Sequence, residues 1–278
     1  MTKIDFRSIS NNLELVDDIW VAKSKSKISY PDEANENCFQ IEENSFWFRH
    51  RNNCIIEVVK QFPPKGIFFD IGGGNGFVAK ELEESGIETV LVEPGEIGVS
   101  NARKRGLRHI ICATLEDAGF KSHTLSTVGL FDVVEHIEDD KTFLKFVFDF
   151  LESKGKLYIT VPAFNFLWSK EDDDAGHFKR YTIKSISEIL NEIGFYVEYA
   201  TYIFSILPIP IFLFRSLLDK LGLGKNRARE ERHKHEHCQR KGIMGKLLGN
   251  VLNMELKCIK DKKMIPFGSS CLIVATHF

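Results

Sequence analysis

The sequence predicts an α/β protein in which helices cover both faces of a mostly parallel sheet. Short apolar runs alternate with stretches of helical spacing along most of the chain, and such alternation is typical of a doubly wound sheet. One of these runs, ending in Asp70-Ile71, leads through closely spaced glycines into a helix that starts at Phe77. A strand, a glycine turn and a helix in this order are typical of a cofactor-binding turn.

Seven strands and seven helical segments are expected. The strands cover residues 67–71, 88–92, 109–112, 127–134, 154–161, 195–202 and 266–276. The helices cover residues 52–61, 77–85, 96–104, 140–151, 183–193 and 245–259, with a helix-like pattern also at 13–21. Pro63-Pro64 ends the first of the main helices, and Thr182 can cap the helix over 183–193.

Length and composition limit the classes of function. With 278 residues, 43% of them hydrophobic, the chain can form one large domain or a domain with an appendage. The net charge of −2 gives no basic footprint, so no nucleic-acid partner is indicated. Six cysteines without a C-x-x-C pair, and no apolar signal region in residues 1–12, predict a cytoplasmic protein with reduced thiols.

The glycine turn distinguishes between two kinds of cofactor. Glycines 72, 74 and 76 form G-x-G-x-G, and Phe77 occupies the position where a dinucleotide fingerprint has its third glycine. Asp70 would repel a pyrophosphate, but it could accept a hydrogen bond from an ammonium group. This favours S-adenosylmethionine (SAM), a sulfonium compound with an amino-acid tail. A structural turn without a ligand is the alternative.

Glu93 ends the second strand, about twenty residues after the glycines, where an acid can bind both hydroxyls of a ribose. With the first motif at 70–76 and this acid, the chain resembles bacterial class I SAM-dependent methyltransferases that act on small molecules. The resemblance implies a Rossmann-like sheet of seven strands, with the last strand antiparallel beside the sixth and a helical insertion between them. The cofactor-binding residues that we predict on this basis are Asp70, Gly72, Gly73, Gly74, Gly76, Glu93, Thr114, Leu115, Phe131 and Arg51.

Two of these positions need comment. Thr114 stands where the family has an acid that reads the adenine amino group, with Glu116 nearby. Arg51 follows an aromatic cluster at 46–48, which resembles the lid that lies across the cofactor in related enzymes. Arg51 or Arg49 could then pair with the SAM carboxylate. In the alternative interpretation the aromatic cluster only packs at the edge of the core.

The end of the fourth strand carries Asp132, Glu135 and His136. This stretch resembles that of ubiquinone-biosynthesis O-methyltransferases and small-RNA 2′-O-methyltransferases, in which an acid-x-x-Glu-His pattern can ligate a divalent cation. Carboxylates and imidazole suit Mg²⁺ or Zn²⁺. Alternatively, Glu135 and His136 only cap the helix that follows.

The stretch 163–182 ends in a Gly-His-x-x-Arg-Tyr signature that resembles a bacterial methyltransferase subgroup. His177 of this signature could act as a general base, or join a metal site. We therefore predict His136 and His177 as catalytic residues, and a metal set of Asp132, Glu135, His136 and His177. In the alternative interpretation His177, Arg180 and Tyr181 only tie the loop through hydrogen bonds.

The expected organisation has four parts: a lid or cap over 1–62, a SAM-binding core over 63–202, an insertion for substrate recognition over 203–265, and a last strand over 266–278. The apolar run at 203–218 is shorter than the ~20 residues of a membrane span. It could line a pocket for a lipidic acceptor, touch a membrane surface peripherally, form a dimer interface or pack as a core helix. The histidines of segment 233–238, beside Cys238, could bind a metal or belong to a solvated loop.

These observations predict a methyltransferase that uses SAM on a small-molecule, lipid, quinone or sugar acceptor, with O-methylation favoured. Two alternatives from other classes remain at this point. One is a non-catalytic SAM- or lipid-binding partner protein, and the other is an oxidoreductase with a nucleotide cofactor.

Overall fold

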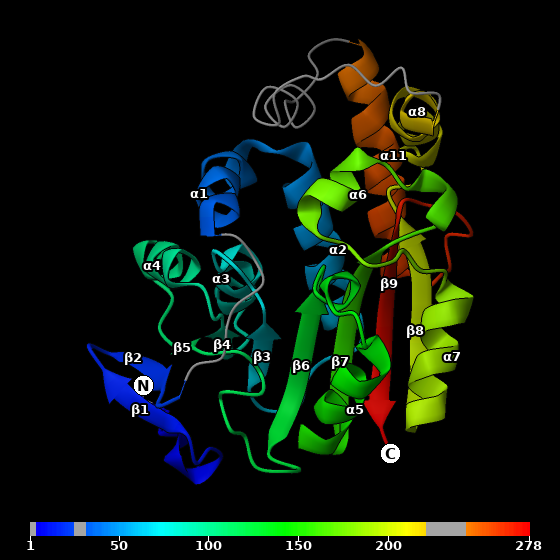
Figure 1. Ribbon diagram of the computed structural model, residues 1–278. Coiled ribbons are helices and arrows are strands. Elements are labelled where there is room, and N and C mark those ends of the chain that lie inside the picture. The colour runs from blue at the N-terminus through cyan, green and yellow to red at the C-terminus, as the bar shows by residue number, and fades with distance from the viewer. Residues whose placement is uncertain (1–3, 25–31, 221–242) are drawn as a thin grey trace.

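The computed structural model describes residues 4–24, 32–220 and 243–278. A single sheet runs through the molecule in the order β1-β2-β5-β4-β3-β6-β7-β9-β8, and Figure 1 shows helices on both of its faces. Its parallel strands include β3 (Phe68–Ile71), β4 (Thr89–Val92), β5 (Ile110–Cys112), β6 (Leu125–Phe131) and β7 (Leu151–Pro162). β9 (Ser270–His277) lies between β7 and β8 (Phe195–Ile203) and is antiparallel to both.

The prediction of a helix over 13–21 is wrong. The prediction of seven strands is also wrong, because the described residues form a sheet of nine. The segment forms an antiparallel hairpin of β1 (Leu13–Val16) and β2 (Ile19–Ala22), and β2 pairs in parallel with β5. Asp17 and Asp18 connect the two strands with φ values of 47° and 66°. Positive φ at both central residues matches the twist of a hairpin. Trp20 is buried on β2, so the hairpin extends the core.

Replacing Trp20 by alanine tests whether the hairpin is part of this core. Trp20 packs edge-on against Phe6 with ring centroids 5.5 Å apart. We expect Trp20→Ala to lower the free energy of unfolding by about 3–5 kcal/mol, as for other buried aromatic truncations. In urea titrations the control Val16→Ala, at an exposed position of β1, should stay within about 0.5 kcal/mol of the parent. Equal, small losses in both variants would contradict the core role.

Helices pack on each face of the sheet. The main ones are α1 (Asp32–Ile41), α2 (Phe46–Gln61), α3 (Phe77–Glu84), α4 (Glu96–Lys104), α5 (Asp140–Phe150), α6 (Lys170–Ala175), α7 (Ile183–Ile193) and α11 (Ile243–Lys260). Two of them, α4 and α7, have the predicted bounds, and the Thr182 hydroxyl caps α7 by accepting a hydrogen bond from Ser185 N at 3.0 Å. α2 begins six residues before its predicted start, because Ser45 caps the N–H groups of Trp47 and Phe48.

The chain leaves the sheet earlier after β6 than expected. The strand predicted over 127–134 ends at Phe131, since Asp132 takes a φ of 58° and Val134–His136 form a 3₁₀ turn, η3. Asp139 caps α5 by accepting a hydrogen bond from Thr142 N at 3.1 Å. The interpretation of Glu135 and His136 as that cap is therefore wrong.

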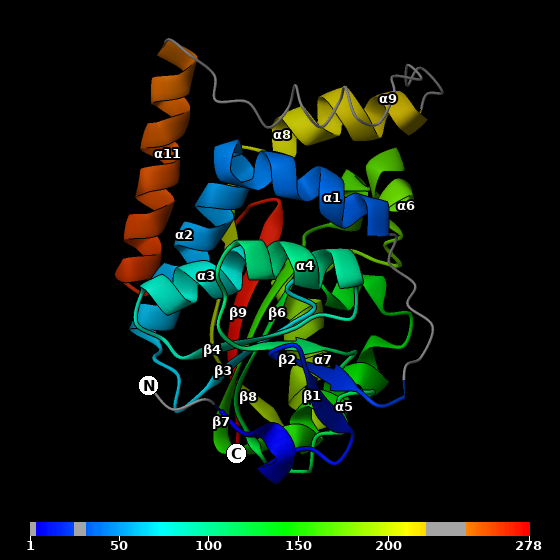
Figure 2. The same ribbon diagram turned by 90° about the vertical axis from the view of Figure 1, so that its left-hand side faces the viewer.

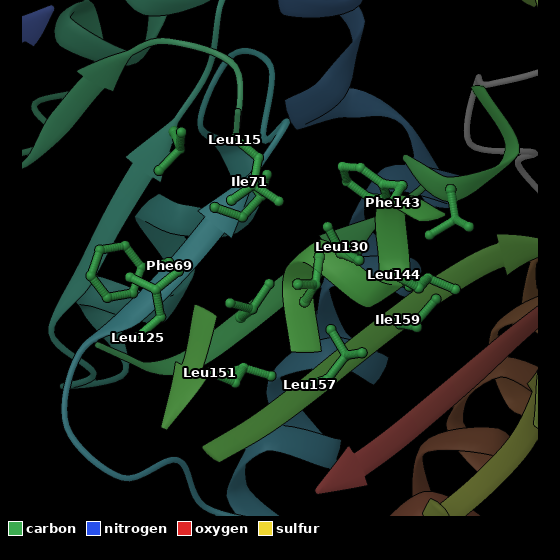
Figure 3. Packing of buried hydrophobic residues seen from close by; sticks show 14 of the residues in the cluster. Phe69, Ile71, Leu115, Leu125, Leu130, Phe143, Leu144, Leu151, Leu157 and Ile159 are labelled. Carbon is green, nitrogen blue, oxygen red and sulfur yellow. The ribbon is translucent and has the colours of Figure 1, made fainter. Parts of the chain in front are cut away.

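Buried hydrophobic side chains pack against both faces of the sheet. Figure 3 shows Leu130 of β6 and Ile159 of β7 near Phe143 and Leu144 of α5, while Phe69 and Ile71 of β3 lie near Leu125 and Leu115 in the same cluster. On the other face, α2, α3 and α11 bury residues such as Ile55, Leu82 and Ile259. With both faces packed, the carboxyl ends of the parallel strands are held at one edge, where ligands bind in such sheets.

The described residues between β8 and β9, 204–220 and 243–269, include four helical segments. They are α8 (Pro208–Ile211), the π-helical turn η5 (Phe212–Ser216), α9 (Leu217–Lys220) and α11. Figure 2 shows α8 and α9 lying across one end of the molecule and α11 standing beside α2. No helix among the described residues is long and apolar enough to cross a bilayer.

A buried side-chain hydrogen bond joins the insertion to the N-terminal segment. His50 Nε2 on α2 lies 2.9 Å from Glu255 Oε2 on α11, and Glu255 also accepts hydrogen bonds from Phe204 N at 2.8 Å and Ser205 N at 2.6 Å. Although burial opposes it, the hydrogen bonds from His50 and Ser205 hold the pKa of Glu255 below its usual value. The histidines of segment 233–238 lie outside the described residues. No disulfide joins the five described cysteines.

Candidate active site

A buried carboxylate lies directly beneath the glycine turn. Asp70 on β3 is fully buried, and neither of its carboxylate oxygens has a hydrogen-bond partner within the described structure. Burial foremost raises the pKa of Asp70 to about 7, the charge of Glu93 adds to the rise, and Arg51 opposes it. A buried carboxylate in this state is stabilised by a cation placed against it.

The turn itself leaves room for a ligand only because it is made of glycine. A Cβ on Gly73 would come within 2.5 Å of Asp70 Oδ2 and of Leu91 Cδ1, and Gly72 and Gly74 have φ values of 67° and 54°. A larger residue at these positions would displace the carboxylate or strain the backbone. The backbone can therefore approach a ligand closely beside Asp70.

Glu93 stands at the end of β4, the neighbouring strand. Its two carboxylate oxygens accept hydrogen bonds from Gly74 N at 2.9 Å and Gly95 N at 2.8 Å. A Cβ on Gly98 of α4 would lie 3.0 Å from Glu93 Cγ and 2.9 Å from Gly74 O. The acid is therefore fixed against the glycine turn, with α4 packed closely behind it.

The N-terminal segment closes over the same turn through residues that the sequence reasoning missed. Asn75 Nδ2 donates to Asn35 O on α1 at 2.9 Å and to Glu42 Oε1 at 3.1 Å. Glu42 in turn accepts a hydrogen bond from Arg105 Nη2 at 2.6 Å. In the sequence, the adjacent acids Glu42 and Glu43 before α2 are the feature that could have indicated the contacts of Glu42 with Asn75 and Arg105.

Arg51 reaches the site but pairs with a protein carboxylate. Its Nη1 lies 2.5 Å from Asp132 Oδ2, and its guanidinium lies over the rings of Trp47 and Phe48, 5.1 and 5.4 Å from their centroids. Arg51 Nε is buried with no hydrogen-bond partner in the described residues. Asp132 also accepts a hydrogen bond from Thr160 Oγ1 at 2.9 Å. The aromatic cluster thus orients Arg51 toward the end of β6.

Three further predicted cofactor residues take part mainly in local structure. The Thr114 hydroxyl accepts a hydrogen bond from Asp117 N at 3.0 Å. The Leu115 side chain is buried in the main core cluster. Phe131 stacks on Phe68 with ring centroids 6.2 Å apart. Thr114 and Leu115 follow the end of β5, and Phe131 ends β6.

A second group of polar side chains lies after β6 and β7. Ligand atoms of Glu135, His136 and His177 all lie within 4.8 Å of one another, a set that could hold a metal ion. Glu135 is buried with Oε2 unpartnered in the described structure, and burial first, then Asp132, raises its pKa. Burial, followed by His177, lowers the pKa of His136 to about 4, so this ring is neutral at neutral pH. Asp132, predicted as a fourth metal ligand, is not part of the set.

His177 is oriented by Asp172, a residue that the sequence analysis did not single out. His177 Nδ1 lies 2.9 Å from Asp172 Oδ1. Arg180 binds both oxygens of the same carboxylate, with Nε at 2.8 Å from Oδ1 and Nη2 at 3.0 Å from Oδ2. Although burial opposes it, the hydrogen bonds from His177 and Arg180 hold the pKa of Asp172 below its usual value. An ionised Asp172 accepts the Nδ1 proton, which leaves Nε2 as the basic nitrogen.

The rest of the signature ties the loop, as its alternative interpretation proposed. Arg180 Nη1 also donates to Ala163 O at 3.1 Å, and Tyr181 Oη donates to Asp140 Oδ2 at 2.7 Å. The signal that could have pointed to Asp172 is the capping box at the start of α6, in which Asp172 accepts a hydrogen bond from Ser169 N at 2.9 Å.

A family model described as a methyltransferase domain matches residues 47–200 of the chain, which is more than half of it. The chain belongs to this family. As a member of the methyltransferase-domain family it is a SAM-dependent methyltransferase, and SAM is its cofactor. The two alternative interpretations, an oxidoreductase and a non-catalytic binding protein, are therefore wrong.

Solved structures show the same fold at low sequence identity. The chain is 15% identical to a SAM-dependent methyltransferase of Thermotoga maritima, described as a possible histamine N-methyltransferase, with a TM-score of 0.54 over 88% of this chain and 95% of that one. It is 13% identical to a structure of a Haloferax volcanii putative methyltransferase with its Trm112 activator, with a TM-score of 0.57 over 88% and 95% of the two chains.

A third relative is longer than this methyltransferase. Phosphoethanolamine N-methyltransferase 2 of Haemonchus contortus, solved with SAM, is 18% identical with a TM-score of 0.54, and the match covers 90% of this chain and 58% of that one. No curated protein matched the sequence. At these identities the likeness concerns the fold alone.

Proposed function

We propose that this methyltransferase transfers the methyl group of SAM to a hydroxyl group of a small-molecule or lipidic acceptor, such as a lipid, quinone or sugar derivative. The observation that carries the proposal is the pair of carboxylates, Asp70 and Glu93, on either side of the glycine turn. They suit the two ends of one cationic nucleoside.

The residues around the turn fit SAM. Asp70 is a buried carboxylate with no hydrogen-bond partner in the described part of the chain, and it would bind the ammonium group of SAM. Arg51, with Nε unpartnered, would bind the SAM carboxylate by exchanging Asp132 for it. Glu93 would bind the ribose hydroxyls, and Thr114, Leu115 and Phe131 would border the adenine ring. SAM supplies the electrophilic methyl group when it is bound.

The chain's own contribution to catalysis is mainly geometric. Holding an acceptor oxygen in line with the reacting methyl group lowers the activation barrier of methyl transfer, because the entropy of bringing the two reactants together is lost on binding rather than in the reaction step. Asp70 and Glu93 would fix the cofactor at its two ends, on strands that lie next to β6 and β7 in the sheet. The Glu135, His136 and His177 cluster follows those strands, and the acceptor hydroxyl would lie against it.

His177 is the proposed general base. Asp172 fixes its Nδ1 proton, so that Nε2 can take the proton of the acceptor hydroxyl. His136 is neutral and can accept or position that proton as well. Glu135, His136 and His177 would together hold a divalent cation, which would lower the pKa of a bound hydroxyl. In that case Asp172 would orient His177 as a ligand.

The segments outside the core have proposed roles as well. Residues 1–62 would act as a lid, because Asn35 and Glu42 contact the glycine turn and α2 carries Arg51. Residues 203–265 would contribute to acceptor recognition, since the His50–Glu255 pair ties α11 to this lid. The proposed reaction is tested by measuring transfer of the labelled methyl group from SAM to each member of a panel of lipid, quinone and sugar acceptors. An acceptor methylated only at nitrogen or carbon would overturn the assignment of O-methylation.

The pKa of Asp70 gives a prediction for cofactor affinity. Asp70 binds an ammonium group only when ionised, and its pKa in the ligand-free protein is about 7. Protonation below that value therefore competes with SAM, and we expect affinity to rise about tenfold from pH 5.5 to 7.0 by linkage. Calorimetric titrations in this range keep the α-amino group of SAM mostly protonated, because the pKa of an α-amino group is about 7.7. Affinity that is flat or falls with rising pH would contradict an ionic contact with Asp70.

A further inference from the structure

A cavity lies between α2 and α11, the two helices that Figure 2 shows side by side. Its volume is about 370 Å³, which is within the range of small-molecule pockets in proteins. Four residues of α2 and six of α11 line it, and their spacing places them on one face of each helix. None of them belongs to the candidate active site. The cavity is therefore a separate feature of the fold.

Much of the cavity wall is apolar. Leu252 and Leu256 of α11 are half-buried and pack against the core on this side of the sheet, and Phe46 and Leu248 line the cavity beside them. Gly249 leaves a gap in this wall, because a Cβ built there would meet no atom within 4 Å. Open space beside apolar side chains suits a hydrocarbon chain, which loses its contact with water there.

The same wall holds a buried histidine whose hydrogen bonds are incomplete. His50 lines the cavity and is only 4% exposed. Its ring makes both of its hydrogen-bond contacts through Nε2, with Glu255 Oε2 at 2.9 Å and Cys54 Sγ at 3.4 Å. Nδ1 thus has no partner among the described residues, although buried polar atoms are ordinarily paired. The polar head of a ligand can supply that partner, as an acceptor for a charged ring or as a donor to a neutral one.

Charge selects the kind of head group. Arg49 lines the cavity at its exposed rim, and none of the lining residues is acidic. The other polar residues of the rim, Asn53 and Asn253, carry neutral amides. An anionic head is attracted to the guanidinium of Arg49, whereas an ammonium head is repelled. One guanidinium matches the single charge of a carboxylate better than the charge of about −1.5 to −2 on a phosphate monoester.

We propose that the cavity between α2 and α11 is a second ligand site, which binds a single-chain amphiphile with a carboxylate head, of the fatty-acid class. The hydrocarbon chain lies along Leu248, Leu252 and Leu256. The carboxylate lies between Arg49 and His50. This site does not rest on the proposed acceptor chemistry or on the proposed contacts with SAM, since it shares no residue with them.

The test is calorimetric titration of the full chain with dodecanoate below its micelle-forming concentration, in the absence of SAM. We expect one dodecanoate to bind per chain. Dodecylammonium, which has the same chain and the opposite charge, should bind more weakly by about tenfold or more. Octanoate should also bind more weakly by about tenfold or more, because each CH₂ group that is removed takes away buried apolar surface.

Two variants and a control locate the site. Gly249→Leu places a side chain in the open space and should weaken the binding of dodecanoate by about tenfold or more. Leucine favours a helix more than glycine does, so folding, checked by thermal melting, should be retained. Arg49→Gln should weaken binding by about tenfold. Lys246→Gln removes the same charge from an exposed position of α11 outside the cavity, and it should leave the affinity unchanged.

The proposal is overturned if the parent protein does not bind dodecanoate, or if it binds dodecylammonium equally well. It is also overturned if either cavity variant binds dodecanoate as the parent does. A last titration is made at saturating SAM, which should leave the affinity for dodecanoate within about twofold. Competition between the two ligands would place the hydrocarbon chain in the cofactor site instead.

Discussion

Replacing His177 by alanine is expected to slow methyl transfer by about 10²- to 10⁴-fold, the usual contribution of a general base. The affinity for SAM should stay within about twofold, because His177 contacts Asp172 and the His136 cluster rather than Asp70 or Glu93. Initial rates with labelled SAM and an accepted acceptor give the first quantity. Calorimetric titration with SAM gives the second.

Two controls define the role of His177. Phe178→Ala alters an exposed neighbour and should leave the rate within about twofold. Asp172→Asn should slow the reaction by a smaller factor than His177→Ala and move the pH profile, because the ring loses its fixed tautomer. Loss of SAM binding in His177→Ala would show that the residue is structural. Full activity after EDTA dialysis supports the general base, whereas loss of activity that Mg²⁺ or Zn²⁺ restores supports the metal set.

Replacing Glu93 by alanine is expected to lower the affinity for SAM by about 100-fold. The carboxylate would accept two hydrogen bonds from the ribose, and a hydrogen bond to a charged group contributes about 1.5–3 kcal/mol. Methylthioadenosine has the same ribose but no amino-acid tail. The affinity of the Glu93→Ala variant for methylthioadenosine should fall by a similar factor. Calorimetry with both ligands measures this.

The matched control is Glu88→Ala. Glu88 is an exposed acid just before the other end of the same strand, far from the glycine turn. Its replacement should change neither affinity. If Glu93→Ala binds methylthioadenosine as the parent does, the ribose is bound elsewhere and the orientation of the nucleoside proposed above is incorrect.

Residues at strand ends were predictable because their chemistry is local. The run ending in Asp70, the glycines after it and Glu93 at the next strand all follow from short patterns, and the structure brings them to adjacent strands. The group Glu135, His136 and His177 was also anticipated, since the strands that carry it are neighbours. That these residues bind SAM or catalyse transfer stays a prediction.

The parts that were wrong or missed depend on contacts between distant segments. Residues 13–21 have enough apolar residues for a helix, but pairing with β5 and the turn at Asp17-Asp18 make them strands. Asp172 is one of four adjacent acids, 171–174, and only the folded structure brings Arg180 and His177 into contact with it. The partner of Arg51 could not be read from sequence either, because Asp132 lies 81 positions away.

The central claim, that Asp70 and Glu93 bind opposite ends of SAM, is tested most directly by titrating Asp70→Asn with SAM and with methylthioadenosine. The amide keeps the shape of the side chain but removes the charge that would face the ammonium group. We predict that the affinity of the Asp70→Asn variant for SAM is lower than that of the parent by about tenfold or more. Its affinity for methylthioadenosine should be unchanged. Equal affinities of parent and variant for SAM, or a parent that does not bind SAM at all, would contradict the claim.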